Sequence, residues 1–176
     1  MCRSVRVFIL LVAFFSFISV SYASGDKALY YEGISYAKRG SLDFAFMLFD
    51  ELTREFSSSA FFEDALFAKG EYYFSICDYN DAYSVFKKIA ASKELSKRKL
   101  FSYVYLFKLS QMLNKDEDIR NQYIKSILTF RQITLLFRDS REITYSSPLQ
   151  KKYRAVYFID HVEVYIDGEK FFKASF

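Results

Sequence analysis

A 37-residue interval links two stretches of this 176-residue chain. Six residues recur at that interval with the same or a similar side chain: Gly33 with Gly70, Tyr36 with Tyr73, Leu42 with Tyr79, Ala45 with Ala82, Phe49 with Phe86 and Leu52 with Ile89. A fixed period of about 20–50 residues is typical of stacked-repeat proteins, in which each unit buries its apolar face against its neighbours. The interval therefore predicts a repeat array, an architecture that commonly presents a surface to another polypeptide.

Each repeat unit has the pattern of two short helices joined by a turn. In the first unit, apolar and small residues follow a helical stripe over residues 28–38, a break follows at Gly40 and Ser41, and a second stripe covers residues 42–55. The second unit repeats this plan over 61–76 and 79–91, with the break at Cys77 and Asp78. A third, degenerate pair of helices is expected around residues 100–109, with an exit at Asn114, and from 117 towards 137. Degeneracy is expected at the end of an array, where a unit acts as a cap.

Residues 27–130 resemble the tetratricopeptide repeat, and two segments carry the resemblance. The segment GISYAKRGSLDFAFMLFDEL places Gly33, Tyr36, Gly40, Ala45 and Phe49 at the family's positions, and GEYYFSICDYNDAYSVFKKI repeats the pattern, with Cys77 in place of the turn glycine. The resemblance implies a mainly all-α fold, an α-solenoid of about three helical hairpins, to which a small C-terminal cap is added. We expect the small residues Gly33 and Ala45 to let paired helices approach closely.

The longer period and the connection SSSAFFEDALF are similar to two periplasmic repeat families. One is the BamD-like lipoprotein of outer-membrane protein assembly, and the other is the repeat domain of the Tol-Pal cell-division coordinator. The chain departs from the first in having neither five repeats nor a lipidated cysteine, and from the second in lacking a preceding coiled coil. The resemblance implies a non-enzymatic scaffold of the bacterial cell envelope that binds another envelope protein or peptide segment.

In the resembled family, the first helix of each unit lines a concave groove that binds the partner. Carried over to this chain, the groove positions are Tyr30, Ile34, Lys38, Phe67, Glu71, Phe74, Val104, Lys108 and Gln111. An apolar floor with a few charges suits a peptide segment. The alternative is that Phe67, Phe74 and Val104 belong to the core or are covered by the C-terminal segment.

The first 23 residues have the features of an export signal. Arg3 and Arg6 precede an uncharged, mostly apolar run over 7–20, and Ser21-Tyr22-Ala23 supplies small residues for cleavage. We expect an exported protein, in the periplasm or at the outer envelope membrane; the alternative is an uncleaved anchor, the one case that implies membrane contact. Cleavage would remove two arginines and lower the net charge from +4 to +2, which gives no indication of nucleic-acid binding.

After the repeat domain, assigned to residues 24–138, the pattern changes in a C-terminal cap segment over 139–176. Ser147 and Pro148 predict the start of a short helix that continues to residue 152. Farther on, apolar residues alternate over 162–166, Asp167-Gly168 suits a tight turn, and residues 169–172 would return as a partner strand. The competing interpretation of residues 153–172 is one helix, and we favour the β-hairpin because β-branched and aromatic residues are frequent there.

The sequence offers little for catalysis. His161 is the one histidine, no glycine-rich phosphate loop is present, and Cys77 is the one cysteine after the predicted signal. We therefore predict no catalytic residues, no cofactor and no metal. The alternative function is an accessory ligand- or metal-binding subunit that uses the cluster from Asp160 to Asp167, with His161 and Glu163 on one face of a strand.

Overall fold

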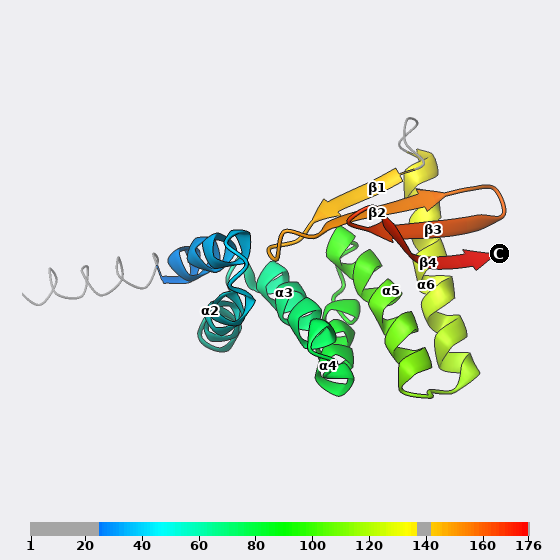
Figure 1. Ribbon diagram of the computed structural model, residues 1–176. Coiled ribbons are helices and arrows are strands. Elements are labelled where there is room, and N and C mark those ends of the chain that lie inside the picture. Colours follow the sequence, from blue (N-terminus) through cyan, green and yellow to red (C-terminus); the bar gives the residue numbers. More distant parts are fainter. Residues whose placement is uncertain (1–24, 137–141, 176) are drawn as a thin grey trace, which may run out of the picture.

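The computed structural model describes residues 25–136 and 142–175, which form a mainly helical protein with a small antiparallel sheet (Figure 1). A first helix covers residues 25–38. It is followed by α2 (Leu42–Glu55), α3 (Phe62–Ser75), α4 (Tyr79–Ala90), α5 (Lys97–Met112) and α6 (Glu117–Leu136). The strands are β1 (Glu142–Ser146), β2 (Lys152–Tyr157), β3 (His161–Ile166) and β4 (Glu169–Ser175).

The helix boundaries agree with the sequence-based prediction to within about three residues, and α4 and α5 each begin at a side-chain cap. Asp78 precedes α4, and its side chain accepts a hydrogen bond from the backbone N–H of Asp81 at 3.3 Å. Ser96 caps α5 in the same way, accepting from the N–H of Lys99 at 3.2 Å. Each cap satisfies a backbone donor that a helix start otherwise leaves unpaired.

The turns inside the three helical hairpins use one backbone conformation at the sequence interval. Gly40, Cys77 and Asn114 lie 37 residues apart and have φ values of +79°, +63° and +49°. This left-handed conformation ends a helix and reverses the chain, and glycine and asparagine adopt it readily. Cys77 therefore replaces the turn glycine in conformation as well as in position. Asn114 has this conformation too, so the turn of the third hairpin matches the other two although the sequence around it has drifted.

Glycine is required at the repeated helix contacts. A Cβ atom at Gly33 would lie 2.8 Å from Cε1 of Phe49, and one at Gly70 would lie 2.7 Å from Cζ of Phe86. Both rings are fully buried and have little room to move. The expectation that Gly33 permits a close helix contact is confirmed, although the neighbour is an aromatic ring rather than a helix backbone. Ala45 is also fully buried.

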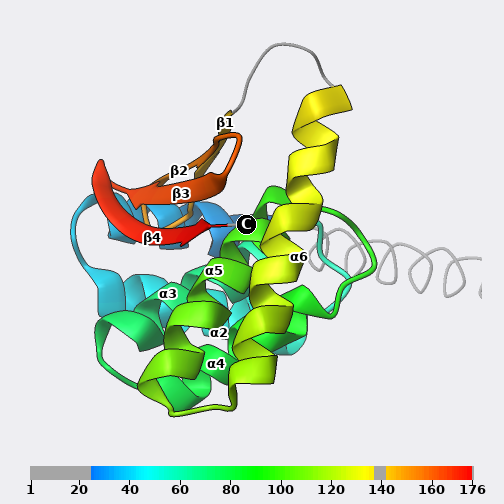
Figure 2. The same ribbon diagram turned by 90° about the vertical axis from the view of Figure 1, so that its right-hand side faces the viewer.

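Each described helix packs mainly against the helices next to it in the chain. Helices α2 and α4 lie on the side away from the sheet, whereas α3 and α5 face it (Figure 1). The sheet has the order β1-β2-β3-β4, with every neighbouring pair antiparallel, and α6 rises beside it (Figure 2). The described chain therefore forms two layers, helices and sheet. The sheet shares the main core with α3 to α6, and the first helix and α2 pack in a second apolar cluster.

Strand β2 shows how the sheet joins the helical core. Tyr153, Ala155 and Tyr157 are buried and alternate with the exposed Lys152 and Arg154. The buried face of the sheet belongs to the same apolar cluster as the inner faces of α3, α4 and α5. The sheet is thus part of the main core, because its removal would expose these aromatic side chains.

The C-terminal predictions are partly confirmed. Strands β3 and β4 form the expected hairpin, with φ values of +52° and +88° at Asp167 and Gly168, so the one-helix interpretation of residues 153–172 is wrong. The helix predicted from Ser147 is also wrong. The N–H of Ser147 donates to the carbonyl of Lys151 at 3.0 Å, which closes a turn between β1 and β2, two strands that the sequence reading did not predict.

The predicted export signal lies outside the described residues. Among the helices of the described part of the chain, none combines the length and apolar character that a membrane span needs.

Candidate functional site

The sheet covers the middle of the predicted groove. Phe67, Glu71 and Val104 are almost completely inaccessible to solvent. The ring of Phe67 packs edge-on against Tyr145 of β1 at 5.3 Å and against Tyr153 of β2 at 5.6 Å. Phe67 and Glu71 are therefore inaccessible to a partner while the sheet stays in place, and Val104 is buried in the same core cluster as Phe67.

Glu71 binds the sheet through a buried hydrogen-bond chain. The hydroxyl of Tyr153 donates to Oε1 of Glu71, and the hydroxyls of Tyr153 and Tyr105 are 2.8 Å apart. Oε2 of Glu71 is buried and has no hydrogen-bond partner in the described part of the protein. Burial raises the pKa of Glu71 to about 7, against the opposing effects of the Lys151 charge and the Tyr153 hydroxyl.

The other groove positions do not form one open surface. Tyr30 is half-buried and stacks on Phe61 at 4.4 Å, and burial raises its pKa to about 12. Ile34 is partly buried against the cluster that contains Leu149 from the β1–β2 turn. Lys38 and Gln111 are exposed, Lys108 is half-buried, and Phe74 lines a cavity described below.

A different surface stands out on the first repeat unit. Phe44 and Met47 of α2 are 58% and 62% exposed and lie three residues apart on one helix face. Tyr36 stacks on Phe44 with ring centroids 5.4 Å apart, and the guanidinium of Arg39 lies 4.8 Å from the Tyr36 ring. We call these four residues the α2 patch.

The α2 patch breaks the repeat. At the interval of 37 residues, Phe44 corresponds to Asp81 and then Asp118, and Met47 corresponds to Ser84 and then Asn121. All four of these polar residues are exposed. The corresponding positions therefore face solvent in every unit, and in the first unit they carry large apolar side chains. Packing between the helices does not explain why Phe44 and Met47 are apolar, since the corresponding residues of the other two units are polar.

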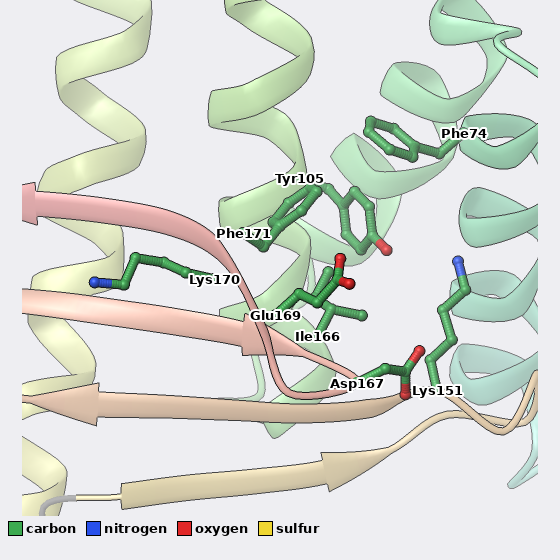
Figure 3. Close-up of a pocket in the computed structure, with 8 residues that line it drawn as sticks. All are labelled: Phe74, Tyr105, Lys151, Ile166, Asp167, Glu169, Lys170 and Phe171. Carbon is green, nitrogen blue, oxygen red and sulfur yellow. The ribbon is translucent and has the colours of Figure 1, made fainter.

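A cavity of about 410 Å³ lies between the β3–β4 turn and the helices α3 and α5 (Figure 3). Its lining residues are Phe74, Tyr105, Lys151, Ile166, Asp167, Glu169, Lys170 and Phe171. The aromatic residues form one wall. The charged residues come from the β1–β2 and β3–β4 turns and from the first two positions of β4. This volume is within the usual range for a small-ligand site.

The cluster from Asp160 to Asp167 does not form one site. His161 lies between two of the acidic residues, with Nδ1 2.7 Å from Oδ1 of Asp160 and Nε2 3.7 Å from Oε1 of Glu163. Glu163 also accepts hydrogen bonds from Lys170 at 2.6 Å and from Tyr165 at 2.5 Å. These bonds lower the pKa of Glu163 to about 2. Asp167 lies at the opposite end of β3, in the cavity. Within the described ranges, no group of three or more His, Cys, Asp or Glu side chains is arranged to hold a metal ion.

Sequence reasoning missed the α2 patch and the cavity. The signal for the patch was available, because Phe44 and Met47 differ in polarity from the residues one interval away. The cavity had no such signal, since it depends on the placement of a turn against two helices distant in the sequence. Comparison with known proteins adds no relative: no protein-family model matches the chain, and no curated protein sequence matches it.

Proposed function

We propose that this chain is a non-enzymatic protein–protein interaction scaffold of the bacterial cell envelope. In this proposal the helices are an α-solenoid of three tetratricopeptide-like hairpins, and the C-terminal sheet closes the middle of the concave face. The common turn conformation at Gly40, Cys77 and Asn114 and the matching contacts of Gly33 and Gly70 support this description. A partner polypeptide docks on the first unit, at the α2 patch.

The observation that carries the proposal is the exposure of Phe44 and Met47 at positions where the other units have polar residues. Contiguous exposed apolar patches mark interaction sites, whereas single exposed apolar residues are normal on protein surfaces. Tyrosine, arginine, phenylalanine and methionine are enriched in protein interfaces. The α2 patch contains one of each, and the Tyr36 ring contacts both Phe44 and Arg39.

The setting in the cell envelope is supported by the export-signal pattern of residues 1–23. An exported repeat scaffold would work in the periplasm or at the outer envelope membrane, with outer-membrane protein assembly as the proposed process. The partner is then another envelope protein or a peptide segment of one.

The test is the double substitution Phe44→Asp and Met47→Ser, which gives the first unit the residues of the second. Asp at position 44 is the third residue of α2, where a negative charge favours the helix, so we expect little change in stability. Crosslinking and purification from envelope fractions should recover a defined partner with the unchanged chain and lose it with the double variant.

The control is Leu95→Ser, which removes an exposed apolar side chain (54% exposed) from the turn between α4 and α5. This variant should keep the partner. If the double variant keeps its melting temperature and still recovers the same partner in the same amount, the α2 patch is not the docking surface.

A further inference from the structure

We propose that the cavity beside the β3–β4 turn binds an organic cation, an ammonium or guanidinium group on a short apolar stem. The basic side chain of a peptide and a small free amine share this chemistry. The inference does not depend on the proposed scaffold function, because the cavity and the α2 patch share no residue.

The aromatic wall suits the stem and the charge of such a ligand. Phe74, Tyr105 and Phe171 contact one another with centroid separations of 5.0, 5.3 and 5.9 Å. Aliphatic stems of lysine and arginine pack on apolar surface of this kind, and a cation is attracted to an aromatic face. The wall is held rigidly, since Tyr105 is almost fully buried and bonded to Tyr153.

The charges around the cavity favour a cation over an anion. Lys170 is engaged by Glu163 at 2.6 Å and extends away from the other side chains (Figure 3). The lining holds two lysines and two acidic residues. Because Lys170 is paired with Glu163, the charges left to a ligand are those of Lys151, Asp167 and Glu169, an excess of one negative charge. Oδ1 of Asp167 accepts the backbone N–H of Lys152 at 2.8 Å. Glu169 has no such bond within the described part of the chain, and its carboxylate points to the aromatic side in Figure 3.

Glu71 is a buried carboxyl group behind the wall. It is joined to Tyr105 through the Tyr153 hydroxyl, and its Oε2 is buried with no hydrogen-bond partner among the described atoms. Lys151 is the cation whose charge acts most strongly on it. The Glu169 carboxylate lines the cavity without a side-chain hydrogen bond among the described residues, so it is the group that a ligand cation would meet.

The experiment is a nuclear magnetic resonance titration of the protein with three capped probes. N-acetyl-lysinamide carries the ammonium, N-acetyl-norleucinamide has the same stem without charge, and a capped Ala-Ala-Lys-Ala-Ala peptide presents the same cation in a chain. We expect the two lysine probes to shift the resonances of Phe74 and Phe171 at millimolar concentration, and the norleucine probe to leave them unchanged.

The matched variants are Glu169→Gln, which keeps the shape and removes the charge, and Glu94→Gln in the turn after α4. We expect Glu169→Gln to weaken binding of the lysine probes about tenfold or more, as expected for loss of a charge-assisted hydrogen bond, and Glu94→Gln to have no effect. Equal binding of norleucine, no binding of either lysine probe, or no effect of Glu169→Gln would each overturn the proposal. A peptide that binds much tighter than the single residue identifies a polypeptide source, and equal binding identifies a free amine.

Discussion

Replacing Glu71 with glutamine should change how the stability of the protein depends on pH. Glu71 is completely buried where α3 meets the sheet, and it accepts the Tyr153 hydroxyl at one oxygen while the other has no hydrogen-bond partner in the described residues. Burial of this kind penalises the ionised carboxylate and raises its pKa from 4.5 to about 7. Glutamine keeps the shape and an acceptor for Tyr153 but does not ionise.

The size and sign of the effect follow from the difference in pKa between the folded and unfolded states. Well below pH 4.5, Glu71 is protonated in both the folded and the unfolded state, so its ionisation does not change the free energy of unfolding. As the pH rises towards 7, the unfolded chain releases this proton and the folded protein retains it, so the free energy of unfolding falls. The shift corresponds to a loss of about 3 kcal/mol, which is complete once the pH exceeds the folded pKa.

Urea denaturation of the unchanged protein and of Glu71→Gln at pH 4.5 and at pH 7.5 measures this effect. The stability of the unchanged protein relative to the variant should fall by about 3 kcal/mol between the two conditions. Glu163→Gln is the control, because the pKa of Glu163 is lowered and its titration lies below this pH window. If the difference in stability between the unchanged protein and Glu71→Gln is the same at both pH values, the burial of a carboxyl group at this position is refuted.

Two further predictions concern the repeats and the N-terminus. Gly33→Val and Gly70→Val should each lower the free energy of unfolding by about 1–3 kcal/mol in chemical denaturation, because the new side chains would collide with the buried rings of Phe49 and Phe86; an unchanged stability in both variants would contradict these contacts. Mass spectrometry of the protein from cells should find a chain that begins at Ser24, whereas retention of residues 7–20 would indicate a membrane anchor.

The helical part of the fold was predictable because its signals are local and repeated. Apolar stripes, polar breaks and one fixed interval place the helices, and the glycine contacts follow from residues that recur at that interval. The sheet was harder to predict. Tyr153, Ala155 and Tyr157 alternate with polar residues, a strand signal, but Ala155 and later apolar residues also fit helical spacing. Pairing with distant strands decided between the two patterns.

The candidate sites show the same division between local and distant information. The prediction that Glu71 faces a groove followed from its place on α3, but the segment that covers it lies about 80 residues later in the chain. No local pattern could assign Tyr153 as its partner. The α2 patch, in contrast, is visible in the sequence once Phe44 and Met47 are compared with Asp81 and Ser84. Their exposure still had to come from the structure.

Site-specific photo-crosslinking in cells tests the central claim most directly. A photoreactive phenylalanine analogue is placed at position 44 or 47 in the α2 patch, or at the corresponding positions 81 or 84 in the second unit. All four positions are exposed, so they are accessible to a partner and differ in the repeat unit to which they belong. The scaffold account predicts one discrete crosslinked product from positions 44 and 47 and none from 81 and 84. The same products from all four positions, or none from 44 and 47, would contradict it.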